Sequence, residues 1–192
     1  MKGRPSRPCS GGERAAYAVL VDRYKDRDFK LAYRMTGRYG DADDLTQEAF
    51  IRAYLNLGRF DTDRSFFTWI YTIALNVVRN HLKIIRDIID GAATWKDGRD
   101  AGSPGDENPE SALGDRQEKA RLQACLLGLP VENREAVVLR FYEDLSFEET
   151  EAVLRISEIA AKMRVYRGLD RLKVMMEEGK MRPFPRHHCI YT

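Results

Sequence analysis

Apolar residues recur every three or four positions over most of the chain, which is the spacing that places them on one face of an α-helix. No segment alternates apolar and polar residues over the length of a convincing β-strand. The pattern therefore predicts an all-α protein. Helices are expected near Arg14–Gly37, Asp41–Leu57, Ser65–Ile89, Pro109–Leu127, Val131–Tyr142, Ser146–Leu154 and Ser157–Glu177.

The helical pattern is interrupted from Gly91 to Gly114, where Gly, Asp, Pro and Ser are abundant. A segment of this composition has too little apolar surface to bury, so we expect an acidic flexible linker. Asn108 and Pro109 are typical of a helix N-cap and first helical position. The chain is thus predicted to contain two small helical domains, arranged as N-terminal tail (1–11), first domain (12–90), linker (91–114), second domain (115–178) and C-terminal tail (179–192).

The predicted helix Ser65–Ile89 has two faces when wound at about 100° per residue. A large aromatic residue beside a basic ridge is what stacking on an unpaired base requires, although a solvated amphipathic helix has the same pattern. The expected core stripe is Phe66, Ile70, Ile73, Val77 and Ile84. The opposite polar ridge is Thr68, Thr72, Asn76, Arg79, Lys83 and Arg86, with Trp69 and Asn80 on one shoulder and Tyr71 on the other.

The helix Asp41–Leu57 also divides into two faces. Leu45, Ala49, Phe50, Ala53 and Leu57 are expected to point inward, and Asp44, Gln47, Glu48 and Ile51 outward. An exposed Ile among acids indicates docking to a basic protein surface. Isolated surface isoleucines are common, so this helix alone leaves both interpretations open.

Near the end of the chain, Ser146 and Glu149 form a capping-box pattern, and a short turn leads to a second cap at Ser157. Two helices joined in this way, the second long and basic, predict a helix-turn-helix. The expected inward stripe of its second helix is Ala161, Val165, Gly168, Leu169 and Leu172. The outward residues are Ile159, Ala160, Met163, Arg164, Tyr166, Arg167 and Arg171, with Lys162 at one flank.

Composition adds mainly exclusions. The net charge of +2 over 192 residues favours no partner by itself, so a nucleic-acid surface has to be a local patch. No run approaches the roughly 20 apolar residues of a membrane span, and we expect a cytoplasmic protein. Cys9, Cys125 and Cys189 form no C-x-x-C pair and are predicted to be free thiols. No metal site, cofactor or small-molecule substrate is predicted.

Two blocks of residues carry a family resemblance. "DADDLTQEAFIRAY" (41–54) with "SFFTWIYTIALN" (65–76), and "LPVENREAVVLRFYEDLSFEET" (129–150), resemble bacterial RNA polymerase sigma factors of the extracytoplasmic-function (ECF) group of the sigma-70 family. The resemblance covers most of residues 12–175. It implies a domain 2 helical bundle and a domain 4 helix-turn-helix, which direct core RNA polymerase to promoters and melt the minus-ten region.

The resemblance also implies partners and contact residues. The partners are the clamp helices of the largest polymerase subunit, the flap of the second-largest subunit, promoter DNA and an anti-sigma factor, for which membrane association is an expectation. Implied polymerase contacts are Asp44, Gln47, Glu48 and Ile51. Implied minus-ten contacts are Arg59, Asp61, Asp63, Trp69, Thr72, Asn76, Arg79, Asn80 and Lys83, and implied minus-thirty-five contacts are Lys162, Arg164, Tyr166, Arg167 and Arg171.

The chain departs from the family pattern in the second domain. Arg155 stands where a turn glycine is usual, Ile159-Ala160-Ala161 replaces the common Gly-Thr-Val, and Met163 replaces a small polar residue. The surface that would face a DNA groove has therefore lost hydrogen-bonding groups.

Three other classes of protein compete with this interpretation. An enzyme is disfavoured because the chain has no Gly-rich phosphate loop, no His-Glu-x-x-His and no nucleophile with a plausible base. A stand-alone helix-turn-helix regulator would need only the second domain, and it predicts duplex binding without polymerase. A protein that only sequesters a partner is the third alternative.

Overall fold

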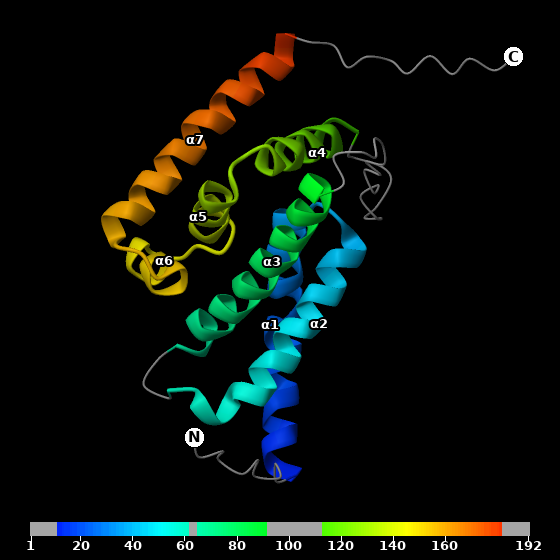
Figure 1. Ribbon diagram of the computed structural model, residues 1–192, viewed down its shortest axis with the longest axis vertical. Helices are drawn as coiled ribbons and strands as arrows, with labels where there is room; N and C mark the ends of the chain where they lie inside the picture. The colour runs from blue at the N-terminus through cyan, green and yellow to red at the C-terminus, as the bar shows by residue number, and fades with distance from the viewer. Residues whose placement is uncertain (1–10, 62–64, 92–112, 182–192) are drawn as a thin grey trace, which may run out of the picture. The chain divides into compact units, whose positions relative to one another are not determined.

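The computed structural model describes residues 11–61, 65–91 and 113–181. All regular elements in these ranges are helices, which confirms the predicted all-α class (Figure 1). The chain divides into two compact units, Met1–Ala101 and Gly102–Thr192. The predicted cap at Asn108 and Pro109, most of the predicted linker and most of both tails lie outside the described residues.

The first unit is a bundle of three helices, α1 (Gly11–Thr36), α2 (Tyr39–Asn56) and α3 (Phe66–Gly91), with a short 3-10 helix η1 (Leu57–Arg59) after α2. Each of the three helices packs against the other two (Figure 1). The turn between α1 and α2 contains Gly37, whose φ of 74° lies in the left-handed region. Large buried side chains of this bundle include Leu31, Met35, Leu45, Phe50, Ile70, Tyr71, Leu75 and Val78.

Two predictions about α3 are wrong. Tyr71 was expected beside the polar ridge but is fully buried, and Ile84 was expected in the core but is 58% exposed. Since α3 packs against both α1 and α2, its buried arc is wider than one apolar stripe and includes Tyr71. The bundle covers α3 only as far as its middle turns, because Lys83, Ile84 and most later residues are exposed.

The second unit contains α4 (Leu113–Leu127), α5 (Val131–Phe141), α6 (Phe147–Leu154) and α7 (Glu158–Met181). The long α7 packs against the other three helices. At Gly168 of α7 a Cβ atom would lie 2.5 Å from Cγ2 of Val137, so the absence of a side chain lets α5 and α7 approach closely. The buried Arg134 donates to the carbonyls of Leu127 (2.6 Å) and Leu129 (3.1 Å) and so caps the end of α4.

The turn between α6 and α7 comprises residues 155–157, the length of turn typical of a helix-turn-helix. Ser146 and Glu149 form the predicted capping box at the start of α6. Arg155 ends α6 with φ 56° and ψ 46°, a conformation that glycine adopts most easily. The Ser157 hydroxyl then accepts a hydrogen bond from the backbone N–H of Ala160 (3.3 Å) and caps α7. α7 continues to Met181, beyond its predicted end.

Candidate nucleic-acid and protein interfaces

One candidate surface is the outer face of α2. Asp44 and Ile51 are exposed, Ile51 at 60% of its surface. The Gln47 amide donates to Asp43 (3.0 Å), and Glu48 forms an ion pair with Arg52 (2.5 Å). These pairs lie along the helix, and both partners are at the surface. The face therefore offers acidic and amide groups around an apolar centre.

Leu55 is 76% exposed and was not predicted as a contact residue. It follows Ile51 by four residues and therefore lies directly beside it on the same face of α2. The spacing was visible in the sequence, but only the structure distinguishes this leucine from an inward one. Together, Ile51 and Leu55 form an exposed apolar pair on the acidic surface of α2.

The polar ridge of α3 is the second candidate surface. Asn76, Asn80 and Lys83 have exposed side chains. Arg79 is half-buried and donates to the Asn76 side-chain oxygen (3.3 Å). The hydroxyl of Thr72 donates to the Thr68 carbonyl (2.8 Å), which leaves its oxygen with acceptor capacity. Arg86, the last residue of the ridge, is exposed as well, so the exposed groups are amides and two cationic groups.

Trp69 lies at the edge of this ridge within a cluster of aromatic rings. Its ring centroid is 5.0 Å from that of Phe60 and 5.5 Å from that of Phe66, and Phe60 and Phe66 are themselves 5.5 Å apart. All three rings are half-buried. The cluster fixes Trp69 in place while leaving part of it accessible. Phe60, which joins η1 to this cluster, was not identified from the sequence.

The remaining predicted contacts of the first unit lie next to this cluster along the chain. Arg59 ends η1, and both Arg59 and Asp61 are exposed. Asp63 lies outside the described residues. Arg59 and Asp61, of opposite charge, therefore flank Phe60, whose ring packs on Trp69.

A side-chain contact that was not predicted from the sequence connects α2 to α3. The His81 Nε2 lies 3.2 Å from Oδ2 of Asp41, and Arg38 Nε lies 3.6 Å from the same oxygen. Asp41 is in the first turn of α2, where a carboxylate is favoured by the helix dipole. His81 follows Asn80, so this contact holds the ridge helix in register with the helix of the acidic surface.

The third candidate surface is the outer face of α7. Tyr166, Arg167 and Arg171 are exposed, whereas Arg164 and Lys162 are half-buried. The Lys162 ammonium forms a 2.7 Å ion pair with Glu158, and the hydrogen bond to Glu158 raises the lysine pKa. The same ammonium lies 5.4 Å from the centre of the Phe147 ring. Lys162 is thus held to the protein surface, while Arg167 and Arg171 have exposed side chains.

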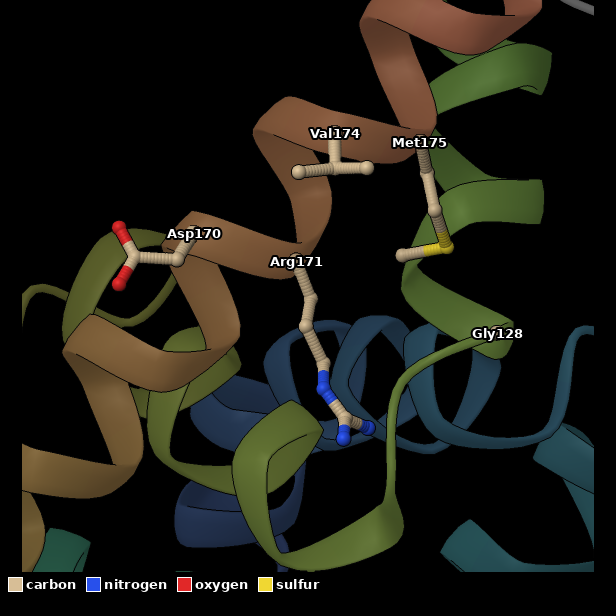
Figure 2. A pocket seen from close by; sticks show the side chains of 5 residues that line it. All are labelled: Gly128, Asp170, Arg171, Val174 and Met175. Carbon is tan, nitrogen blue, oxygen red and sulfur yellow. The ribbon is translucent and has the colours of Figure 1, made fainter.

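A pocket of about 340 Å³ lies on the same helix in the second unit (Figure 2). Its walls are Gly128, Asp170, Arg171, Val174 and Met175, and Figure 2 shows Val174 and Met175 projecting from adjacent positions of α7. Arg171, a predicted DNA contact, therefore also lines an apolar depression.

The part of the chain that the structure describes contains no cluster of residues able to hold a metal ion and no helix able to span a membrane. Cys125, the cysteine within it, is a free thiol.

The bundle and the helix-turn-helix define a class of two-part helical proteins with a nucleic-acid-binding motif. Family models match each part: Sigma-70 region 2 matches residues 20–84, and Sigma-70, region 4 matches residues 119–172. The chain is 33% identical over 172 residues to the ECF RNA polymerase sigma factor SigW of Bacillus subtilis, covering 87% of this chain and 92% of the relative. It is also 33% identical over 162 residues to the RNA polymerase sigma-H factor of Pseudomonas aeruginosa, covering 82% and 84%.

The chain therefore belongs to the sigma-70 family and is an RNA polymerase sigma factor of the ECF type. Among solved structures, the fold is similar to that of the sigma factor RpoE in complex with the anti-sigma factor NepR from Bartonella quintana, with a TM-score of 0.69 and 17% identity over 84% of this chain and 97% of that one. It is also similar to CnrH in complex with the cytosolic domain of CnrY, with a TM-score of 0.65 and 26% identity over 87% and 91%. The match to region 2 leaves no reason to prefer a stand-alone helix-turn-helix regulator.

Proposed function

We propose that three helix faces divide the work of initiation. The acidic face of α2 docks on core RNA polymerase, the polar ridge of α3 engages the melted minus-ten strand, and the outer face of α7 binds the minus-thirty-five duplex. The main support for this proposal is that the named face of α2, α3 and α7 lies in each case opposite the buried stripe of that helix. Its functional groups are therefore available without unfolding the unit.

The polymerase contact is supported by the chemistry of α2. Asp44, Gln47 and Glu48 supply acceptors, and Ile51 with Leu55 supplies apolar area at the centre. An apolar centre with a polar rim is the usual anatomy of a protein interface. The acidic rim fits a basic partner surface, which we assign to the clamp helices of the largest polymerase subunit.

The melting role is supported by the combination of Trp69 with exposed amides on α3. Extruding a base from a duplex costs a few kcal/mol of stacking and pairing. Stacking on an aromatic ring returns about 1–3 kcal/mol per base, and Asn76 or Asn80 can hydrogen-bond a base edge. Arg59, Arg79 and Lys83 supply positive charge for the phosphates. The protein performs no chemistry on the base, so in this role it is not an enzyme.

The duplex role of α7 is supported by its position as the second helix of the helix-turn-helix. In this motif the second helix enters the major groove. Lys162, Arg164, Tyr166, Arg167 and Arg171 are its candidate contacts to phosphates and bases. We assign the flap of the second-largest polymerase subunit to the same unit as a protein partner.

An anti-sigma factor is a further proposed partner. In one similar structure the sigma factor RpoE is bound to the anti-sigma factor NepR, and in another CnrH is bound to the cytosolic domain of CnrY. We propose that this chain works in the cytoplasm and is inhibited there by a partner of this kind, which membrane anchoring would hold at the inner face.

Reconstitution tests the central proposal. Sigma-free bacterial core polymerase is mixed with the full chain, and transcripts are mapped on a library of genomic fragments. We expect transcripts that start at defined promoters and require the added chain.

Asp44→Ala combined with Leu55→Ala should weaken association with core polymerase, because it removes acidic and apolar parts of the proposed interface. Asp26→Ala, an exposed carboxylate on α1, is the matched control. Unchanged association of the α2 variant would count against the docking role.

A second experiment separates melting from binding. Asn80→Ala and Lys83→Ala remove exposed groups of α3 without removing core packing, which makes them cleaner than a change at the packed Trp69 ring. We expect the double variant to impair transcription from duplex promoters much more than from templates with a pre-melted bubble. Asp87→Ala, also exposed on α3, is the control. Equal losses on both templates would contradict the melting role.

A further inference from the structure

The first turns of α7 carry an exposed apolar stripe. Ile159 is 75% exposed, Tyr166 55% and Met163 46%. At about 100° per residue these three side chains fall within about 60° of one another on the helix. The opposite face is buried through Ala161 and Val165. The stripe is therefore the outermost part of the helix that the helix-turn-helix presents.

Positive charge borders this stripe on both sides. Lys162 lies on one flank, where Glu158 and Phe147 hold its ammonium at the edge, and Arg167 lies on the other flank. Arg167 therefore supplies positive charge on one flank, and Lys162, whose ammonium is ion-paired with Glu158, lies on the other. An apolar centre with basic side chains at its edges is complementary to a DNA major groove, whose rims are phosphates. An apolar protein partner would account for the stripe but not for the cationic edges.

The chemistry of the stripe limits which base edge it can contact. Ile has no hydrogen-bonding group, and Met has only a weak thioether acceptor. The base edges in the major groove present hydrogen-bond donors and acceptors, and thymine alone adds an apolar 5-methyl group. Contact with any other base would leave polar atoms of the base facing Ile159 or Met163 without a partner.

We propose that Ile159 and Met163 specify thymine in the upstream promoter element by apolar contact with its 5-methyl group. This inference rests on the proposed role of α7 in binding that element. The arginines and Lys162 then contribute affinity through phosphates, and the apolar pair contributes sequence preference. Ile159 and Met163 thus contact thymine methyl groups and make no hydrogen bonds to bases.

The test uses the full chain bound to core polymerase. A duplex promoter is first selected from a library that is randomised in the upstream element, and each thymine of that element is then replaced singly by deoxyuridine, which removes only the methyl group. We expect at least one replacement to weaken binding by about three- to fivefold, the effect of one buried methyl group. Ile159→Ala or Met163→Ala should weaken binding to the thymine promoter and remove the difference between thymine and uracil at one position.

Two controls keep the result specific. Val174→Ala shortens another exposed apolar side chain of α7 and should retain the full uracil effect. Arg167→Ala should weaken binding to thymine and uracil promoters by the same factor, because a phosphate contact is insensitive to the base. Thermal unfolding of each variant confirms that exposed substitutions leave the fold intact.

The outcomes separate the inference from the proposed function. If Arg167→Ala and a scrambled upstream element weaken binding while uracil never does, the methyl contact is overturned and the duplex role of α7 stands. If none of these changes affects binding, both fail. If Ile159→Ala leaves the uracil effect intact but reduces self-association in sedimentation experiments, the stripe is a protein interface and the inference is overturned.

Discussion

The helices α3 and α7 are both long, both amphipathic and both proposed to contact promoter DNA, yet their exposed faces differ in chemistry. The face of α3 presents Asn76, Asn80 and Lys83, whereas α7 begins with the exposed apolar residues Ile159 and Met163. An unpaired base exposes hydrogen-bonding groups that a duplex conceals, and amides suit such groups. A paired base in the major groove exposes its methyl group, which apolar side chains suit.

The two helices are also held in place differently. α3 packs against two neighbours through large buried side chains and is linked to α2 by the Asp41–His81 contact. α7 depends on a close approach to α5 at Gly168 and on the caps of the turn before it. A helix that presents a binding surface can therefore be held in place either by many buried side chains, as α3 is, or by a close helix–helix approach and helix caps, as α7 is.

The substitution with the greatest predicted effect is Gly168→Ala, which disturbs the close packing of α7 on α5. In Gly168→Ala the new Cβ would lie 2.5 Å from a methyl carbon of the buried Val137, whose short side chain cannot move aside. Overpacking of this kind typically costs about 1–3 kcal/mol, so we expect a lower unfolding temperature for the second unit and a loss of upstream DNA binding. Scanning calorimetry of the full chain measures the first effect.

The matched control for that variant is Gly40→Ala. A Cβ at Gly40, in the first turn of α2, meets nothing within 4 Å. It should therefore stabilise the first unit slightly, by up to about 0.5–1 kcal/mol, because alanine has less conformational freedom than glycine in the unfolded chain. A Gly168→Ala protein as stable as this control would show that α5 and α7 do not pack closely at this position.

The next effect concerns a buried hydrogen bond between α1 and α2, in the bundle against which α3 packs. The buried Tyr17 hydroxyl donates to the Phe50 carbonyl at 2.6 Å, and burial raises the pKa of Tyr17 from its ordinary value of 10.0 to about 12. Tyr17→Phe should lower the unfolding free energy by about 1 kcal/mol at neutral pH, as for a typical hydrogen bond. Chemical denaturation measures this loss.

The same tyrosine predicts a pH dependence. Because its pKa is raised in the folded state, the neutral phenol stabilises the fold fully below about pH 10, and this contribution is lost as the pH rises through about 12. The wild-type chain should therefore lose stability relative to Tyr17→Phe between these pH values. Parallel pH profiles of the two proteins would reject the assignment.

A smaller effect concerns the link between α2 and α3. Asp41 and His81 are half-buried and 3.2 Å apart, so a double-mutant cycle with alanine should give a coupling of about 0.5 kcal/mol. The pair Asp43 and His81 serves as a control cycle and should show no coupling. If both cycles gave the same value, the proposed link would not exist.

The smallest expected effect is a gain in stability at the turn before α7. A left-handed residue other than glycine costs about 1–2 kcal/mol, and the greater freedom of glycine in the unfolded chain costs about 0.5–1 kcal/mol. Arg155→Gly should therefore stabilise the second unit by about 0.5 kcal/mol, as measured by denaturant titration. Arg155→Ala keeps the strained φ of 56° and should not produce this gain.

The local structure of this protein could be predicted from its amino-acid sequence. Helices were predicted within a few residues of their observed bounds. This was possible because a periodicity of 3.6 residues depends only on the sequence of the helix itself. The capping box at Ser146 and the cap at Ser157 were also predictable, because a cap involves only residues within three positions. For the same reason, the outward direction of Ile51 and Ile159 could be predicted from a single helix.

Which residues the neighbouring helices cover depends on how the helices pack, and the sequence did not predict it. Tyr71 is buried because α3 has two neighbours, and Ile84 is exposed because those neighbours do not cover that part of α3. The contact of His81 with Asp41 and the packing of Trp69 on Phe60 join separate elements, so no periodicity along the chain contains them. The number, length and distance of neighbouring helices are set by the packing of the whole unit. A helical wheel describes one helix in isolation and therefore cannot predict them.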